Sequence, residues 1–356
     1  MIDVFLSEFM QLSLITSMAL MFSLHIITII FWPTLMSKLQ LKYYRQIQRI
    51  HEGEVPRIGG LISVIGIVLY WMMCSHGKAM PFVEALLISS IPLLMISLKE
   101  DFFHNTLASS RLLAMFLSCF LFFYSFDINF PKIDFPGLGQ LIDSSVIISW
   151  LFYGFCVVVI VNGNNLIDGT NGLMPMSIII QIMSLFFICL ELQDITNMIR
   201  LIYITVPICI FLIFNYPWGK VFMGDLGAYF FGFFISMLTI VIYGDHPELP
   251  NWGAVVILFY PAFELLFSVC RKIYQGTNPM QADSKHLHIL MFHVFRSRMI
   301  RNRVSNALVL PCLALLWAIP FIFISWVYQS LILSIMAMIA MAIIYLGFYW
   351  ALNRKK

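Results

Sequence analysis

The chain has 356 residues, of which 61% are hydrophobic and only 11% are charged. A soluble globular domain has about 45–50% apolar and about 25% charged residues, so this composition argues against a cytosolic enzyme or a secreted domain. The net charge of +3 does not indicate a nucleic-acid partner, because no basic soluble domain accompanies it. We therefore predict an all-α, polytopic integral membrane protein.

Eleven runs of the sequence are apolar enough to cross a bilayer, since a spanning helix needs about 20 largely apolar residues. We expect these eleven transmembrane helices to form a single domain that covers residues 1–356. In chain order, the runs lie at approximately 11–36, 58–75, 82–98, 110–126, 144–161, 173–190, 198–215, 226–243, 252–270, 304–327 and 330–351.

The positive charges of the connecting segments predict the orientation of the chain. Connections after odd-numbered runs, together with the C-terminal tail, hold 18 of the 21 Lys and Arg residues. The opposite side holds only Lys78, Lys132 and Arg200. Because cytoplasmic loops carry the excess of Lys and Arg, we predict a periplasmic N-terminus and a cytoplasmic C-terminus. The cytoplasmic loops are then approximately 37–57, 99–110, 162–172, 216–225 and 271–303.

Carboxylates, whose burial at membrane depth is energetically unfavourable, lie in these predicted cytoplasmic loops. Glu100 and Asp101 begin the second loop, Asp168 lies in the third, Asp225 in the fourth, and Asp283 in the fifth. Acidic groups near membrane depth favour a functional interpretation. Their convergence on one face is typical of an oxygen-ligand Mg²⁺ site. Each loop taken alone could also be a turn with a solvated acid.

Small and amide side chains surround two of these acids. Gly163, Gly169 and Gly172 flank Asp168, and glycine allows backbone to approach a ligand closely. Asn162, Asn164, Asn165 and Asn171 add amide donors and acceptors beside the same carboxylate. The pattern matches neither a P-loop nor a dinucleotide-binding fingerprint.

Six ordered segments carry a family resemblance: VPRIGG (55–60), KEDFFHNTLASSRLL (99–113), NGNNLIDGTNGL (162–173), VFMGDLGAYFFGF (221–233), PAFELLFSVCRK (261–272) and DSKHLH (283–288). With these motifs the chain resembles the polyprenyl-phosphate N-acetylhexosamine-1-phosphate transferases, the WecA/MraY-like members of glycosyltransferase family 4. The eleven predicted spans are more similar to the WecA type than to the MraY type, which has ten.

Four positions depart from the family pattern. Glu100 replaces the first Asp of a D-D pair, and Glu264 replaces the Asp of P-x-F-D. Ser284 stands at the Arg of the last motif, and Ile289 stands at its third His. Glu264 lies seven residues before Arg271, which favours a side chain that extends to the membrane interface.

The resemblance implies transfer of a HexNAc-1-phosphate from a UDP-sugar to undecaprenyl phosphate, with release of UMP. This reaction would begin a lipid-linked glycan such as O-antigen at the cytoplasmic face of the bacterial inner membrane. It implies Mg²⁺, or Mn²⁺ in its place, held by Asp225 and Asp168. Membrane lipids are further partners, nucleic acid is not expected, and a homodimer is left open.

The resemblance also implies the site residues. Asp225 is the first candidate for a metal ligand, and Asp168 is a second ligand or a contact to the nucleotide sugar. Asp101, with Glu100, is expected to deprotonate or position the lipid phosphate. The expected substrate-binding residues are Arg57, Arg111, Asn162, Asn165, Gly169, Asn171, Gly172, Lys285, His286 and His288.

Two other functions remain open at this point. Transfer of phospho-MurNAc-pentapeptide is a close alternative within the family. A secondary transporter is the alternative of another class, because such proteins also combine many spans with acidic residues. The acids of this chain gather in loops on one side, which favours surface chemistry over a transport path.

Overall fold

The computed structural model describes residues 2–39, 55–73, 80–133, 135, 137–281, 283–298 and 301–354. These residues contain helices and no strand, which confirms the predicted all-α class. Lys42, Arg45 and Arg49 of the first predicted cytoplasmic loop lie outside the described residues. The helices are α1 (Ile2–Leu39), α2 (Gly59–Met73), α3 (Met80–Ser89), α4 (Ile91–Phe103), α5 (Ala108–Ser125), α6 (Leu138–Asp143), α7 (Val146–Ile167), α8 (Leu173–Glu191), α9 (Ile195–Asn215), α10 (Gly224–Asp245), α11 (Trp252–Ile257), α12 (Phe259–Tyr274), α13 (Leu287–Ser297), α14 (Asn302–Leu313), α15 (Leu315–Val327) and α16 (Leu331–Asn353).

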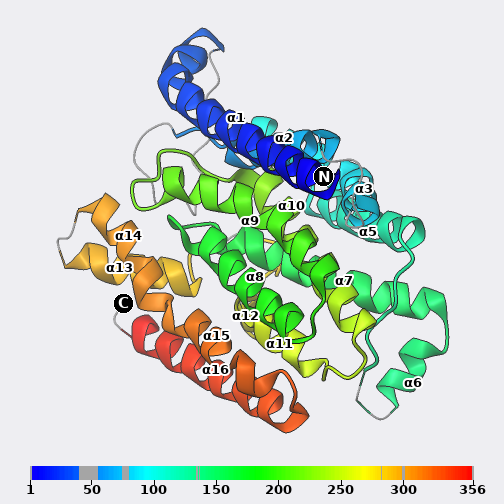
Figure 1. Cartoon of the computed structure of the whole chain (residues 1–356). Coiled ribbons are helices and arrows are strands. Elements are labelled where there is room, and N and C mark those ends of the chain that lie inside the picture. Colours follow the sequence, from blue (N-terminus) through cyan, green and yellow to red (C-terminus); the bar gives the residue numbers. More distant parts are fainter. Residues whose placement is uncertain are drawn as a thin grey trace.

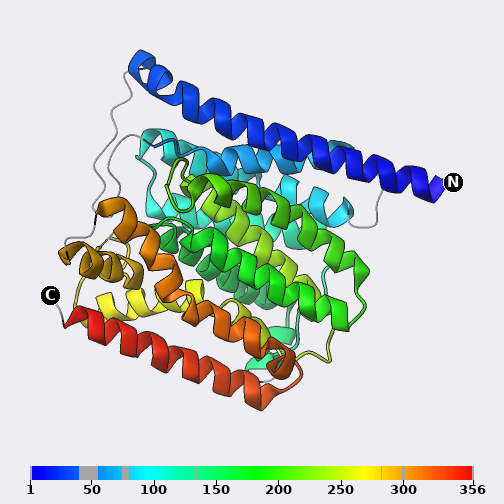
Figure 2. The same cartoon turned by 60° about the vertical axis from the view of Figure 1, so that its left-hand side comes forward.

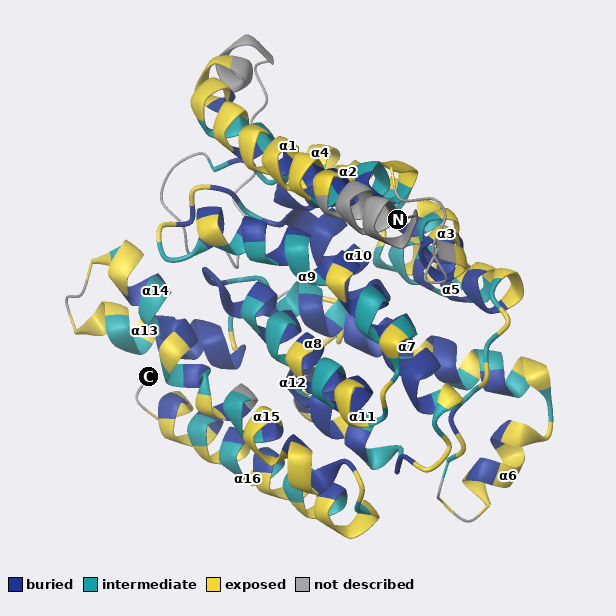
Figure 3. Cartoon of the chain, viewed as in Figure 1, coloured by how far each residue is buried: buried dark blue, intermediate teal, exposed yellow. Residues whose placement is uncertain are grey.

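Helix α10 is the centre of the bundle (Figure 1). Its sequence is apolar on all sides, as expected for a helix surrounded by others, and its whole 18-residue apolar window is buried. α2, α4 and α7 pack directly against it, and α7 also packs against α12. The outermost helices α1 and α16 are mostly exposed, as Figure 3 shows, and their exposed residues are largely apolar. This distribution is what a lipid-facing exterior requires.

The structure identifies fewer full-length spans than the sequence predicts. Among the described residues, eight segments are long and apolar enough to cross a membrane: α1, α5, α7, α8, α9, α10, the α14–α15 pair and α16. The pair α3–α4, bent by 47°, raises this number to nine. The predicted run 58–75 corresponds to the 15-residue α2, and the run 252–270 is divided into α11 and α12. The count of eleven is therefore not confirmed, although the described residues of each predicted run contain helix.

Prolines lie close to the helix breaks that lower this count. Pro92 occupies the first turn of α4, just after its junction with α3. Pro261 lies in the first turn of α12, just after the break at Leu258. Proline lacks an N–H group and clashes with the preceding turn, so it fits the beginning of a helix better than its interior. Hydropathy alone does not reveal such breaks.

The two ends of the chain lie at opposite ends of the bundle (Figure 2). α1 begins at one end, and α16 finishes at the other, which is also the end with the loops that join α4 to α5 and α9 to α10. The assignment of these ends to periplasm and cytoplasm stays a prediction from the Lys and Arg distribution.

Candidate active site

The segment before α2 and the segment before α10 are joined through their backbones. The Phe222 N–H donates to the Pro56 carbonyl at 2.8 Å. In return, the N–H groups of Gly59 and Gly60 donate to the carbonyls of Phe222 and Met223 at 3.0 and 2.9 Å. These bonds fix the PRIGG segment against the FMGD segment, which is more than 160 residues away in the chain.

Glycines make this close contact feasible. A Cβ atom at Gly60 would lie 2.3 Å from the Gly227 Cα atom, so no side chain fits there. Gly224 has a φ of +76°, in the left-handed region that favours glycine. A Cβ at Gly224 would lie 2.6 Å from the Arg57 carbonyl oxygen and 2.7 Å from Asp101 Oδ2. The glycines therefore bring the first, second and fourth predicted loops together.

Asp101 caps the first turn of α10. Its Oδ1 accepts a hydrogen bond from the Asp225 N–H, and its Oδ2 accepts one from the Leu226 N–H, both at 2.9 Å. The first N–H groups of a helix have no partner within the helix, and an anion there also interacts favourably with the helix dipole. Asp101 thus holds the beginning of α10, and with it Asp225, in place.

Asp225 is the point at which four segments meet. Its Oδ1 accepts hydrogen bonds from Arg57 Nη2 at 3.2 Å and Asn165 Nδ2 at 3.1 Å. Its Oδ2 lies 3.6 Å from Arg111 Nη1. Arg57 Nη2 also lies 3.7 Å from Asp101 Oδ1. The predicted residues Arg57, Asp101, Arg111, Asn165 and Asp225 are therefore one cluster in space.

Asp168 follows directly after α7 and lies within electrostatic range of this cluster. Burial raises the pKa of the Asp168 carboxyl well above its ordinary value. The Arg57 guanidinium opposes this shift, whereas the carboxylates of Asp225 and Asp101 add to it. Three acids thus share one site with two guanidinium groups, and the added positive charge of a cation would offset their repulsion.

These residues fit a divalent cation, although no group of three or more His, Cys, Asp or Glu side chains in the described ranges is arranged to hold one. Mg²⁺ is commonly bound through one or two carboxylates, with waters and substrate phosphates as its other ligands. Asp168 and Asp225 supply two hard oxygen ligands of this kind. The observation that favours a cation here is the gathering of Asp101, Asp168 and Asp225 in one site: burial raises the pKa of the Asp168 carboxyl most, and the other two carboxylates add to this shift.

Glu100 and Asn162 do not point into the cluster. The Glu100 Oε2 accepts hydrogen bonds from the N–H group, at 3.0 Å, and the hydroxyl group of Thr106. These bonds close the turn between α4 and α5. The Asn162 Nδ2 donates to the Val158 carbonyl at 2.8 Å, one helical turn back in α7. In the described structure, both side chains stabilise local backbone.

Asn171 and Gly172 anchor the loop that follows Asp168. The Asn171 N–H donates to Asn306 Oδ1 at 2.7 Å, and its side-chain amide donates to the Pro217 carbonyl at 2.8 Å. The Gly172 N–H donates to Asn215 Oδ1 at 2.6 Å, and its φ is +78°. Asn215 and Asn306 were not identified from the sequence. Both are polar amides inside predicted apolar runs, and this unusual placement could have indicated their role.

His288 lies directly against the loop that follows α7, which contains Asp168 and Gly169. A Cβ at Gly169 would lie only 2.5 Å from His288 Nε2, so this position needs glycine. His288 is buried, and burial lowers its pKa to about 3; the nearby Glu264 carboxylate opposes this shift and His286 adds to it. The His288 ring is therefore neutral at physiological pH. It lies beside the backbone of the residue that follows Asp168.

His286 is held between two acids. Its Nδ1 lies 3.2 Å from Glu264 Oε1, and its Nε2 lies 3.3 Å from Asp283 Oδ1. Glu264 is only 1% exposed, so the expectation that its side chain extends to the interface is wrong. The reason is that a buried partner, His286, satisfies the carboxylate. Lys285 is exposed, and its N–H donates to Asp283 Oδ1 at 3.2 Å.

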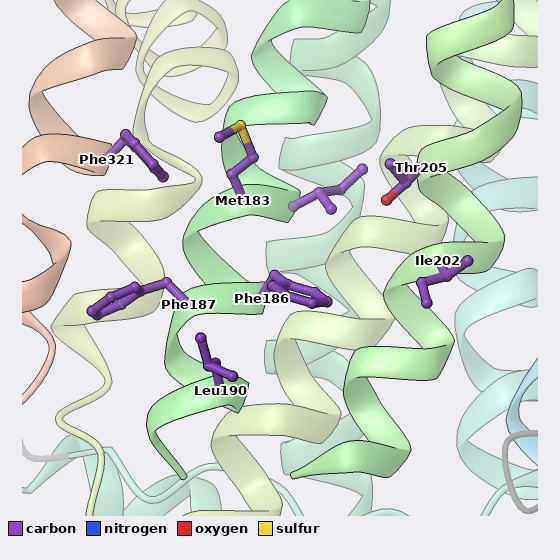
Figure 4. Close-up of a pocket in the computed structure, with 8 residues that line it drawn as sticks. Met183, Phe186, Phe187, Leu190, Ile202, Thr205 and Phe321 are labelled. Carbon is purple, nitrogen blue, oxygen red and sulfur yellow. The ribbon is translucent and has the colours of Figure 1, made fainter. Parts of the chain in front are cut away.

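An apolar groove of about 340 Å³ lies elsewhere, between α8, α9 and α15 (Figure 4). Its lining contains no titratable side chain, so it is separate from the acidic cluster. The lining residues are Ile182, Met183, Phe186, Phe187, Leu190, Ile202, Thr205 and Phe321.

Comparison with known proteins agrees with the motifs. Residues 83–243 match the profile of glycosyl transferase family 4, and this region contains Asp101, Asp168 and Asp225. Over this region the chain is similar to glycosyl transferase family 4. The resemblance inferred from the sequence is thereby confirmed. The individual roles of the site residues stay predictions.

Two relatives are similar to this chain over about two thirds of its length, and a third over a shorter region. It is 23% identical over 245 residues to a probable undecaprenyl-phosphate N-acetylglucosaminyl 1-phosphate transferase of Bacillus subtilis, with 68% of this chain and 66% of the relative covered. It is 27% identical over 252 residues to an undecaprenyl-phosphate alpha-N-acetylglucosaminyl 1-phosphate transferase of Thermotoga maritima, with 70% of each covered. A phospho-N-acetylmuramoyl-pentapeptide-transferase of Dictyoglomus thermophilum is 31% identical, but over only 105 residues, or 30% of this chain and 33% of the relative.

Proposed function

We propose that this chain transfers a HexNAc-1-phosphate from a UDP-sugar to undecaprenyl phosphate and releases UMP. The observation that carries this proposal is the cluster in which Asp225 contacts Arg57, Arg111 and Asn165 while Asp101 fixes the start of α10. Relatives named for N-acetylglucosaminyl 1-phosphate transfer to undecaprenyl phosphate support the same reaction class. A transporter would not require this arrangement at one end of the bundle.

The chemistry requires that two anionic reactants approach each other. Arg57 and Arg111 supply guanidinium groups, which suit the paired oxygens of a phosphate. In the proposed mechanism they exchange part of their contact with Asp225 for the phosphates of the substrates. Asp168 and Asp225 would hold Mg²⁺, which when bound neutralises charge on the diphosphate. Asp101 acts by keeping Asp225 at the start of α10.

The position of the cluster suits one soluble and one lipid substrate. The site lies where α7 ends and α10 begins, and we propose that this end of the bundle lies at the membrane surface, between the aqueous phase and the lipid headgroups. A water-soluble nucleotide sugar and a phosphate at the membrane surface can both reach such a site. The distribution of Lys and Arg supports its assignment to the cytoplasmic face of the membrane. We further propose that this is a bacterial inner membrane and that the reaction begins surface-polysaccharide synthesis.

The test is UMP release by the purified chain in detergent with undecaprenyl phosphate and Mg²⁺. The donors are UDP-GlcNAc, UDP-GalNAc, UDP-QuiNAc, UDP-FucNAc and UDP-MurNAc-pentapeptide, and matched reactions lack the lipid or contain EDTA. We expect UMP release that requires the lipid and is abolished by EDTA. Release with only the pentapeptide donor would favour the alternative transferase. No release with any donor, from folded protein, would contradict the proposal.

A further inference from the structure

Glu264 is a buried carboxylate whose two oxygens have different partners. Its Oε1 accepts a hydrogen bond from the Leu287 N–H at 3.2 Å and lies 3.2 Å from His286 Nδ1. Its Oε2 accepts a hydrogen bond from the Tyr345 hydroxyl at 2.7 Å. A buried carboxylate is costly unless hydrogen bonds satisfy it. Tyr345 is the donor that comes from outside the motif-bearing segments.

Tyr345 reaches Glu264 from α16, the last helix of the chain. The hydroxyl-bearing ring is fully buried and packs against Phe263 and Phe267 of α12, with ring centroids 4.9 and 5.5 Å apart. Most of α16 is exposed and apolar, as Figure 3 shows, and contributes no other side chain to the contacts described above. The ring packing holds the hydroxyl at a fixed place beside the carboxylate.

The chain of contacts continues from Glu264 to the loop after α7 that contains Asp168 and Gly169. The rings of His286 and His288 lie nearly parallel, at 8°, with centroids 5.9 Å apart. His288 Nε2 in turn lies against Gly169, the residue after Asp168. His286 directly precedes α13, and His288 lies in its first turn. The hydrogen bond from the Leu287 N–H to Glu264 holds the same helix start.

We propose that Tyr345 is a positioning residue for phosphosugar transfer: its hydroxyl orients Glu264, which holds His286 and the start of α13 so that His288 supports the Gly169–Asp168 loop. This inference rests on the proposed function for its kinetic test. Tyr345 touches no reacting group; it acts through Glu264. The Tyr345 hydroxyl therefore influences the active site from α16, a helix that otherwise faces lipid.

The first experiment compares Tyr345→Phe with Tyr349→Phe. Both changes remove one hydroxyl from α16, and both rings pack on Phe267, but only Tyr345 donates to Glu264. In the UMP-release assay we expect kcat of Tyr345→Phe to fall about tenfold, with KM for the nucleotide sugar changed less than about twofold. Tyr349→Phe should keep wild-type values. Equal kcat for the two variants would overturn the proposal.

The second experiment tests whether Tyr345 acts through Glu264. If it does, Tyr345→Phe should lower kcat in the wild-type chain but have no further effect in the Glu264→Gln background. Such non-additivity is the signature of residues that act as a unit. Effects that multiply in the double variant would show that Tyr345 acts elsewhere, and would overturn the proposal.

A third measurement keeps this inference separate from the proposed reaction. In histidine-labelled protein, ¹H–¹⁵N spectra report the ring nitrogens of His286, assigned with a His286→Asn variant. We expect Tyr345→Phe to shift these resonances and Tyr349→Phe to leave them unchanged. This result does not depend on turnover, so failure of every donor in the UMP assay would refute the proposed function alone. Superimposable His286 resonances in all three proteins would refute the role of Tyr345.

Discussion

The side chain of Asp101 holds the backbone of Asp225. The Asp225 N–H donates to Asp101 Oδ1 at 2.9 Å, and the next N–H of α10 donates to the other oxygen. One predicted catalytic acid thus positions another, and both oxygens of Asp101 have backbone partners. Because both oxygens are engaged in this way, we predict that Asp101 acts by positioning Asp225 and not by direct contact with the lipid phosphate.

Substitution of Asp101 should therefore reduce both stability and activity. Asp101→Asn keeps the shape, but its amide can accept only through one oxygen, so one N–H group of the first turn of α10 loses its partner. Loss of such a cap costs about 0.5–2 kcal/mol. We expect a lower melting temperature in detergent and greatly reduced UMP release. A variant with the wild-type melting temperature would contradict the capping role.

Asp225 and Asp168 should be essential for turnover but not for folding. Asp225→Asn and Asp168→Asn each remove one of the charges that would hold a divalent cation, and we expect UMP release to fall by at least about 10²–10³-fold. Asp143→Asn, at an exposed position in α6, is the matched control and should retain activity. Wild-type-like release by both site variants, from protein that inserts normally, would refute the assignment.

The sequence predicted the members of the cluster because charge bias sorted the loops. Lys and Arg counts placed Asp101, Asp168 and Asp225 on one side, and the structure brings these three acids within electrostatic range. The apolar runs likewise predicted where helices form, since hydropathy reports burial in lipid or protein. These inferences needed only local composition and the fact that successive loops lie on alternate sides of the membrane.

The sequence could not predict which distant groups pair. Glu264 lay near the end of an apolar run, a position equally compatible with an interfacial side chain, and only the fold brings Tyr345 to it. Asn215 and Asn306 similarly anchor the loop after Asp168 from separate helices. The sequence also did not predict the break between α3 and α4, because an average of hydropathy over a window of residues conceals a change in helix direction.

Gly169 should tolerate no side chain. In Gly169→Ala the new methyl group would meet His288 Nε2 at 2.5 Å, so the buried ring or the loop must move. Displacement of a loop by about 1 Å can cost about 10²-fold in rate, and we expect at least a tenfold loss of kcat. Gly347→Ala, where no atom lies within 4 Å of the added carbon, is the control. Equal activity of the two variants would contradict the close contact.

The dependence of activity on Mg²⁺ should vary with pH. Since the pKa of Asp168 is raised by burial and by the neighbouring acids, a proton competes with the cation for this carboxylate. Lower pH should therefore raise the Mg²⁺ concentration needed for half-maximal UMP release, and excess Mg²⁺ should shift the acid limb of the pH profile to lower pH. Titrations of Mg²⁺ between pH 6 and 8.5 measure this effect. A half-maximal concentration that does not change with pH would exclude the competition.

A histidine at the far end of α10 should make stability depend on pH. His246 Nε2 lies 3.0 Å from Asp194 Oδ2, and its Nδ1 lies 3.1 Å from Glu248 Oε1. Partial burial lowers the pKa of His246, but hydrogen bonds and charges of these two acids outweigh burial and raise it. The imidazolium therefore stabilises the fold fully below the unfolded pKa of about 6.5, and this contribution disappears as pH rises through the higher folded pKa.

The size of this contribution is limited to about 0.5 kcal/mol, because the groups are partly exposed to solvent. Melting temperatures of the wild type and His246→Gln between pH 5.5 and 8.5 provide the measurement. We expect the wild type to be the more stable protein at pH 5.5 and the difference to shrink towards pH 8.5. A difference that stays constant over this range would mean that His246 stabilises the end of α10 by packing and neutral hydrogen bonds, without its charge.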